Sequence, residues 1–199
     1  ENLIHHKRVN VDVYKGDKKA EDSEVIEEGM TLKVSYKEVS KEFNISLVKV
    51  YKEYAATGMT AEVGSFQPNN NTEGNGNLAL DNNLNTMWHT NWNGCQRSET
   101  WITIDMKKEQ NVTMLKYTPR QGGGTNGNIT AYEIYVSKDG QTWGEPVATG
   151  TWANNNVVKY ARFDTVSGRY VKLVATNSAS QEVSKIFASA AEIRLGFEE

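Results

Sequence analysis

Apolar and polar residues alternate one by one through much of this chain, and this alternation most constrains its fold. The alternation is regular at residues 101–106, 112–117 and 131–136. Successive side chains of a strand point to opposite faces, so a period of two indicates strands with one buried face. No helical period of useful length is present. Short strands separated by turn signals predict an all-β protein, and a β-sandwich is the simplest such architecture.

The composition of the chain changes near residue 57. Residues 1–57 are rich in Lys and Glu, contain no Trp, and alternate at 9–14 and 30–36. We expect a small all-β module or linker domain there, with a core that is marginal for its size. Residues 58–199 are denser in Asn, Gly, Thr, Trp and Tyr. We expect them to form the β-sandwich, with a binding site on the loops at one end.

Charge, hydropathy and cysteine content argue against several classes of protein. The net charge is -3 and no long basic run is present, so neither nucleic acid nor an anionic membrane is an expected partner. No apolar run approaches the length of a transmembrane segment. The single cysteine, Cys95, excludes an internal disulfide. Its polar loop indicates an ordinary loop residue rather than a catalytic thiol.

Three separated segments carry residue types that suit a sugar ring. They are residues 88–92, 119–127 and 187–192. Together they offer aromatic faces, an imidazole, a guanidinium and an amide. A pyranose has an apolar face that packs on an aromatic ring and a hydroxyl rim that pairs with planar donors and acceptors. The combination favours a lectin-like binding module over an enzyme.

A series of motifs spans nearly the whole second module. They lie at residues 79–90, 101–106, 117–121, 126–127, 132–143, 169–173 and 189–193. In this order they resemble the family 32 carbohydrate-binding modules of the F5/8 type C, or discoidin-like, superfamily. The resemblance implies a jelly-roll-like β-sandwich of the discoidin type that binds sugars on surface loops. Similar modules belong to large secreted bacterial glycosidases. It therefore also implies an extracellular bacterial protein, secreted or at the cell surface, and a monomer within a larger multimodular enzyme.

The resemblance also implies the residues of the sugar site. Galactose-binding members use a histidine and a tryptophan three positions later, which correspond to His89 and Trp92. The arginine, asparagine and late aromatic of the family correspond to Arg120, Asn126 and Phe187. An imidazole and a guanidinium that converge on the axial O4 of galactose would reject glucose. The expected ligand is terminal galactose or N-acetylgalactosamine on host or mucin-type glycans, and the module would target a parent glycoside hydrolase to them.

The loop at residues 78–86 is rich in oxygen ligands, which hard cations prefer. Family members hold a structural calcium ion in this loop, so the resemblance implies a calcium ion here. By position, its ligands would be the carboxylates of Asp81 and Glu192, the hydroxyl and carbonyl of Thr86, and the carbonyls of Leu78, Asn83 and Ala191. We expect the ion to be structural and to have no catalytic role.

Three alternatives stay open. An enzyme would use Asp81 and Glu192 as an acid/base pair for glycoside hydrolysis, but the calcium site accounts better for both residues. A discoidin-like adhesion module would bind phospholipid or protein through apolar loop tips. A module that prefers N-acetylglucosamine-containing glycans would need an altered binding loop, and residues 93–98 are the candidate for such a change.

Overall fold

The computed structural model describes residues 9–46, 50–182 and 184–199, which fall into two compact units divided between residues 49 and 50. Each unit is described by itself. The division lies before the boundary expected at residue 57. The reason is that strand β5 (Tyr51–Glu53) pairs with the last strand, β14 (Glu192–Glu198), and so belongs to the second unit.

The first unit is a single antiparallel sheet with strand order β2-β1-β3-β4. Its strands are β1 (Asn10–Lys15), β2 (Lys18–Lys19), β3 (Thr31–Tyr36) and β4 (Val39–Asn44). Among its described residues, Met30 is the one buried hydrophobic side chain, whereas Val39 and Phe43 are exposed. The alternation at 9–14 and 30–36 is therefore realised as strands, but no second layer covers them within the described part of this unit.

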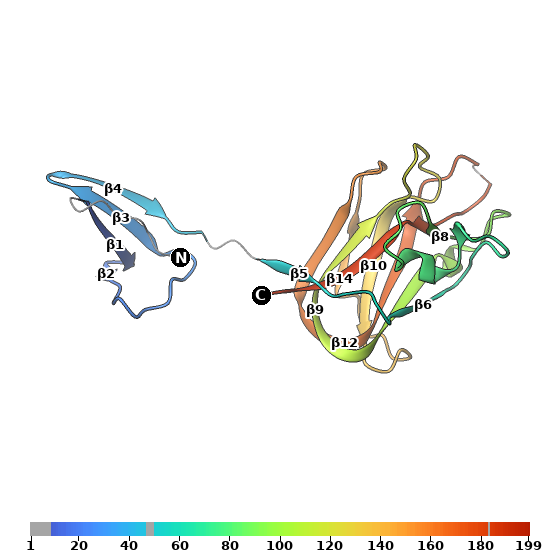
Figure 1. Cartoon of the computed structure of the whole chain (residues 1–199), viewed down its shortest axis with the longest axis horizontal. Coiled ribbons are helices and arrows are strands. Elements are labelled where there is room, and N and C mark those ends of the chain that lie inside the picture. Colours follow the sequence, from blue (N-terminus) through green and yellow to red (C-terminus); the bar gives the residue numbers. More distant parts are fainter. Residues whose placement is uncertain (1–8, 47–49, 183) are drawn as a thin grey trace. The chain divides into compact units, whose positions relative to one another are not determined.

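The second unit is built almost entirely of strands, which confirms the predicted discoidin-type β-sandwich (Figure 1). Its elements are β5, β6 (Thr60–Val63), β7 (Glu73–Gly74), η1 (Gly76–Ala79), β8 (Met87–His89), η2 (Arg97–Glu99), β9 (Trp101–Thr118), β10 (Ile129–Ser137), β11 (Ala148–Thr151), β12 (Lys159–Ser178), β13 (Ser189–Ala190) and β14. Seven strands form one curled sheet with the order β11-β10-β12-β9-β14-β5, and β6 pairs with β9. In the described part of the chain, no helix is long and apolar enough to cross a membrane.

The long strands β9 and β12 each pass through both layers of the sandwich. The first half of β9 pairs with β6 and the end of β12, and its second half pairs with β14 and the start of β12. Lys107, with φ of 67°, marks the bend in β9. At the bend of β12, a Cβ on Gly168 would collide with Val136. The two alternating runs at 101–106 and 112–117 are therefore parts of one curved strand.

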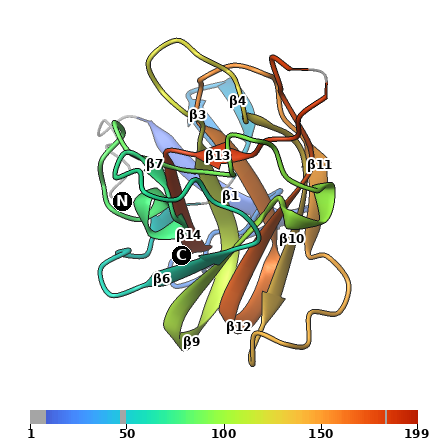
Figure 2. The same ribbon diagram turned by 90° about the vertical axis from the view of Figure 1, so that its right-hand side faces the viewer.

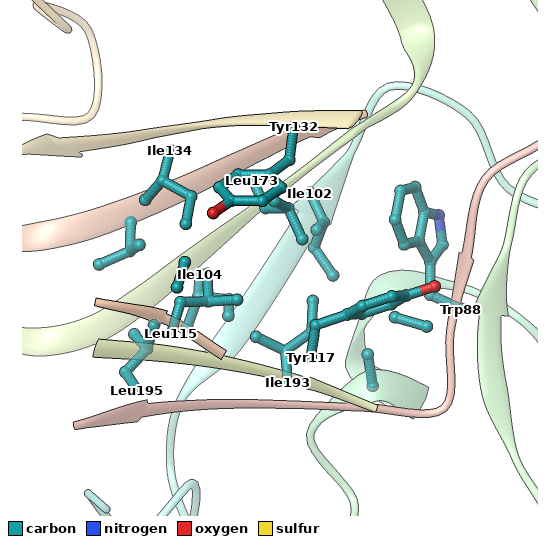
Figure 3. Packing of buried hydrophobic residues seen from close by; sticks show 14 of the residues in the cluster. Trp88, Ile102, Ile104, Leu115, Tyr117, Tyr132, Ile134, Leu173, Ile193 and Leu195 are labelled. Atoms are coloured by element: carbon teal, nitrogen blue, oxygen red, sulfur yellow. The ribbon is translucent and has the colours of Figure 1, made fainter. Parts of the chain in front are cut away.

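Apolar side chains from the two layers meet in one core (Figure 3). Ile102 and Leu173 come from one layer, and Leu115 and Ile193 from the other. The buried Tyr117 ties this core to the loop end of the sandwich. Its hydroxyl donates to the Ser189 carbonyl at 2.9 Å and accepts the Ile129 N–H at 3.1 Å. The loop end is thereby anchored on the core.

A small three-stranded sheet, with the order β13-β8-β7, lies at one end of the sandwich. Strand β13 is antiparallel to β8, and β7 is parallel to it. In Figure 1, β8 lies at the end of the second unit away from β5 and the C-terminus, and Figure 2 views the molecule from that end. Of the three candidate sugar-binding segments, residues 88–92 begin in β8 and residues 187–192 include β13. Residues 119–127 form the loop that follows β9.

Candidate functional site

His89 ends strand β8 and is only 1% exposed. Its ring packs against Phe187, with 5.6 Å between ring centroids. Nδ1 lies 2.7 Å from the carbonyl oxygen of Thr90, so Nδ1 carries the hydrogen and Nε2 is an acceptor. Burial lowers the pKa of His89, so the ring is neutral at pH 7. Among the described residues no hydrogen bond is made by Nε2, which leaves it as the acceptor nitrogen of the ring.

Arg120 follows β9 and is held in place by two acceptors. Nη2 donates to Oε1 of Glu73 at 3.2 Å, and Nη1 donates to the carbonyl of Asn126 at 3.3 Å. Nε is buried and has no partner in the part of the chain that the structure describes. The charges of Glu73 and Arg120 act in opposite directions on the pKa of His89. The guanidinium and the imidazole therefore lie within electrostatic range of each other.

Asn126 belongs to a loop that is docked on β13. Its carbonyl accepts from Arg120 and from the hydroxyl of Ser189 at 3.4 Å. Its side-chain Oδ1 accepts the N–H of Gln181 at 3.1 Å. The next residue, Gly127, has φ of 84°, and a Cβ there would lie 2.8 Å from the Ser189 hydroxyl. Glycine is therefore required for this docking.

The two remaining sugar-site candidates differ sharply in exposure. Trp92 is 44% exposed, and its backbone N–H donates to Oε1 of Gln67 at 3.0 Å. Phe187 is 2% exposed and lies against the His89 ring. Both rings were expected to cover the apolar face of a sugar. In this structure Trp92 presents the open aromatic face, and Phe187 supports the imidazole from the protein side.

Glu73 is a site residue that sequence reasoning missed. It orients Arg120 through the 3.2 Å ion pair, in which both side chains are mostly buried. Strand β7 brings it there, because Glu73 and Met87 are register partners in the parallel β7–β8 pair. An isolated glutamate in an Asn/Gly-rich loop carries no local signal for this role, and only the long-range pairing places it.

Four of the expected calcium ligands converge between the 78–86 loop and β14. The Thr86 hydroxyl lies 2.7 Å from Oδ2 of Asp81 and 2.8 Å from the carbonyl oxygen of Asn83. Oε1 of Glu192 accepts the Asn83 N–H at 3.0 Å. Leu78 is part of η1, which contacts β14. Ala191 directly precedes Glu192 and is buried.

The electrostatics of this cluster fit a cation. Oε2 of Glu192 is buried and accepts no hydrogen bond from the described residues. Burial raises the pKa of Glu192, as does the charge of Asp81, whereas Arg194 opposes both. The guanidinium of Arg194 lies 2.5 Å from Oε2 and also donates to Asn82 Oδ1 at 2.6 Å. The ligand oxygens suit calcium, although the described chain gathers no group of three or more His, Cys, Asp or Glu residues.

Cys95 has the environment of a structural loop residue. It is a free, half-buried cysteine, and its Sγ lies 3.4 Å from the carbonyl oxygen of Ile186. Burial raises the pKa of the thiol. A thiol with a raised pKa carries little thiolate at neutral pH, so the position does not fit a nucleophile.

Comparison with known proteins assigns most of the second unit to a family. Residues 60–193 match the F5/8 type C domain. Galactose oxidase of Gibberella zeae is 46% identical over 106 residues, covering 52% of this chain and 16% of the relative. An A type blood N-acetyl-alpha-D-galactosamine deacetylase of Flavonifractor plautii is 32% identical over 160 residues, covering 79% of this chain and 20% of the relative. The chain thus spans a fifth or less of the length of these relatives.

Solved structures give the same assignment. A Clostridium perfringens module, CpGH89CBM32-5, in complex with GalNAc-β-1,3-galactose, superposes with a TM-score of 0.63 at 32% identity, covering 72% of this chain and 99% of that one. The family 32 module of C. perfringens NanJ, in complex with galactose, superposes with a TM-score of 0.60 at 32% identity, covering 74% of this chain and all of that one.

The sandwich and its loop site define a non-catalytic binding module of the family 32 carbohydrate-binding type. The chain belongs to the F5/8 type C domain family. The resemblance found in the sequence motifs is thereby confirmed for the second unit. The nature of the first unit as a linker module stays a prediction.

Proposed function

We propose that the second unit binds terminal galactose or N-acetylgalactosamine on host or mucin-type glycans. The observation that supports this most directly is a pair of fixed polar groups at the loop end: the His89 ring, held through Nδ1 by the Thr90 carbonyl, and the Arg120 guanidinium, held by Glu73. One group offers an acceptor nitrogen and the other offers N–H donors. A sugar hydroxyl both donates and accepts, so a single hydroxyl between them satisfies both groups.

The axial O4 of a galacto sugar is the hydroxyl that suits this pair. Its O–H would donate to Nε2 of His89, and its oxygen would accept an N–H of Arg120. Asn126 would pair with the neighbouring O3, and Trp92 would pack on the apolar face of the ring. Glucose carries its O4 equatorially and would leave the two groups unpaired, which costs binding free energy. Glu73 would help to hold the guanidinium in place through its 3.2 Å contact with Nη2.

The relatives are consistent with a targeting role. Two modules that are 32% identical to this chain were solved with galactose or with GalNAc-β-1,3-galactose. We infer that this module is a monomeric part of a longer, secreted or cell-surface bacterial glycosidase and directs that enzyme to its glycan. A single sugar offers few contacts, so the dissociation constant is expected near the millimolar range. Several modules on one enzyme would then raise the overall avidity.

Calorimetric titration with galactose, N-acetylgalactosamine and glucose tests the proposal. We expect both galacto sugars to bind and glucose not to bind. His89→Ala should abolish binding because it removes the acceptor for O4. Trp92→Ala should weaken it, whereas Tyr160→Ala, which removes an aromatic ring of equal 44% exposure elsewhere, should leave it unchanged. The absence of heat with all three sugars, from a folded sample with calcium, would overturn the proposal and direct the search to N-acetylglucosamine-containing glycans.

We also propose a structural calcium ion held by Asp81, Thr86, Glu192 and the carbonyls of Leu78, Asn83 and Ala191. The observation that supports it is the convergence of oxygens from Asp81, Thr86, Asn83 and Glu192 between the 78–86 loop and β14. The ion would join the 78–86 loop to β14 and order the neighbouring β8. Calcium should raise the thermal midpoint of the second unit by about 5 °C or more, and a chelator should reverse the change. Glu192→Gln should remove this response. An unchanged midpoint in the wild-type protein would contradict the site.

A further inference from the structure

Phe66 is an exposed aromatic residue next to the proposed sugar site. It is 45% exposed, close to the 44% of Trp92. The loop that carries it, residues 64–72, leads from β6 to β7. Neither the predicted site nor the proposed contacts with a single galactose use this ring. Exposed apolar surface that adjoins a site often marks a ligand-binding groove, and Phe66 adds such surface beside the segment that carries Trp92.

Hydrogen bonds fix the backbone on both sides of Phe66 to the β8 loop. The four bonds are Trp88 Nε1 to the Ser65 carbonyl at 3.0 Å, Asn91 N–H to the Ser65 hydroxyl at 3.1 Å, Gln67 N–H to the His89 carbonyl at 2.9 Å, and Trp92 N–H to Gln67 Oε1 at 3.0 Å. Phe66 is therefore held between two residues that both bind the segment carrying His89 and Trp92. Its position relative to the site is set by the fold.

The two loop segments that carry Phe66 and Trp92 are polar and uncharged. Residues 65–72 and 90–96 contain no charged side chain and are rich in Asn, Gln, Ser and Thr. Amides and hydroxyls beside exposed aromatic rings suit a neutral sugar. An acidic glycan or a charged peptide would find no counter-charge on these two segments.

We propose that Phe66 forms a second subsite, which contacts the neutral sugar linked to the terminal galactose or N-acetylgalactosamine. This inference rests on the proposed function, because the terminal sugar must occupy the His89 and Arg120 site. The ligand of the module is then a disaccharide or a longer glycan. Phe66 would pack on the apolar face of the second ring, since its segment is hydrogen-bonded to the segment that carries Trp92.

Titrations with monosaccharides and disaccharides test the subsite. The probes are galactose, N-acetylgalactosamine, and neutral disaccharides that end in either sugar through β-1,3 and β-1,4 linkages. At least one disaccharide should bind more tightly than its terminal sugar alone. Phe66→Ala should weaken binding of that disaccharide by about three- to tenfold and leave monosaccharide binding unchanged. The matched control is Phe43→Ala, which removes an equally exposed ring, at 45%, from the first unit and should change neither.

Three results would overturn the inference, and they distinguish a failure of the subsite from a failure of the proposed function. If the wild-type protein binds the monosaccharides but gains nothing from any disaccharide, or if Phe66→Ala weakens both classes of ligand equally, the second subsite is wrong and the proposed function stands. If the wild-type protein binds none of these galacto sugars, the proposed function fails and the subsite fails with it. Retention of the thermal midpoint in Phe66→Ala shows that the variant is folded.

Discussion

The sheet of the first unit and the sandwich of the second differ in what covers their apolar faces. Both contain alternating strands. In the second unit, β9 and β12 bend, and the apolar faces of the two layers pack against each other. In the described residues of the first unit, Met30 is the one buried hydrophobic side chain, and Val39 and Phe43 face solvent. In the second unit, Ile102 and Leu115 lie within one large cluster.

The difference shows that alternation specifies a strand but not a core. A core needs a second apolar layer, and β9 and β12 supply one by curving through both sheets. Hydrophobic burial contributes about 25 cal/mol per Å² of apolar surface, so most of the folding free energy of this chain is expected to reside in the second unit. The site residues are attached to that stable unit, which favours a preorganised binding surface.

The largest expected effect separates a core side chain from a surface one of the same type. Trp88→Ala should lower the free energy of unfolding of the second unit by about 3–5 kcal/mol, because it leaves a cavity and unpairs the Ser65 carbonyl. Trp92→Ala is the matched control and should change it by less than about 0.5 kcal/mol. Chemical denaturation followed by circular dichroism measures both values. Similar losses in the two variants would mean that Trp88 is not a core residue.

The stability of the second unit should depend on pH through His89, and this effect is expected to be intermediate in size. Burial holds the pKa of His89 below the ordinary 6.5. The folded state then binds the proton less readily than the unfolded state, so the stabilisation is complete above about pH 6.5 and is lost as the pH falls through the folded pKa. The loss amounts to about 1.4 kcal/mol for each unit of pKa difference. Sugar binding should decline over the same range, because protonation removes the acceptor at Nε2.

The measurement for this pH effect is denaturation of the wild-type protein and His89→Gln at several values between about pH 7.5 and 5.5. Subtracting the two series removes the contribution of the carboxylates that both share. The wild-type protein should lose relative stability as the pH decreases. A difference that is constant across the range would show that His89 does not titrate differently in the folded state.

The smallest effect is expected in the first unit. Phe43→Ser exchanges an exposed ring on β4 for a hydroxyl and should change the unfolding of that unit by about 0.5 kcal/mol or less. Hydrogen exchange of the β3 and β4 amides can report on this unit separately. A marked loss of protection in β3 would indicate that Phe43 is covered in solution. The first unit would then also bury an apolar face, and the difference between the two units in buried apolar surface would be smaller.

Much of the fold could be predicted from the sequence, because alternation and turn signals are local. The strands at 101–106, 112–117 and 131–136 are all present in the structure. It could not be predicted that the first two runs join into one curved strand. The bend at Lys107 requires a positive φ, and a lysine in the sequence gives no signal for that conformation. The sequence placed residues 51–53 in the first module for a similar reason. The pairing of β5 with β14 joins residues at opposite ends of the second unit and leaves no local signal.

The site shows the same division between local and long-range information. His89, Arg120 and Asn126 were expected from motifs, and the structure brings them together. Glu73 was missed because only the parallel pairing of β7 with β8 places it under Arg120. The burial of Phe187 could not be anticipated either. An aromatic residue in a loop has the same sequence signal whether it faces solvent or packs against a histidine.

The pairing of β5 with β14 has a mechanical consequence. Residues 50 and 199 lie side by side, because the Glu199 N–H donates to the Val50 carbonyl at 2.8 Å, and β8 with its loops lies at the far end of the unit (Figure 1). A pulling force applied to the chain on both sides of this unit would act on the short β5–β14 ladder first. The hydrogen bonds of that ladder would break one after another, and the loops of the candidate sugar site would bear little load until β5 had separated from β14.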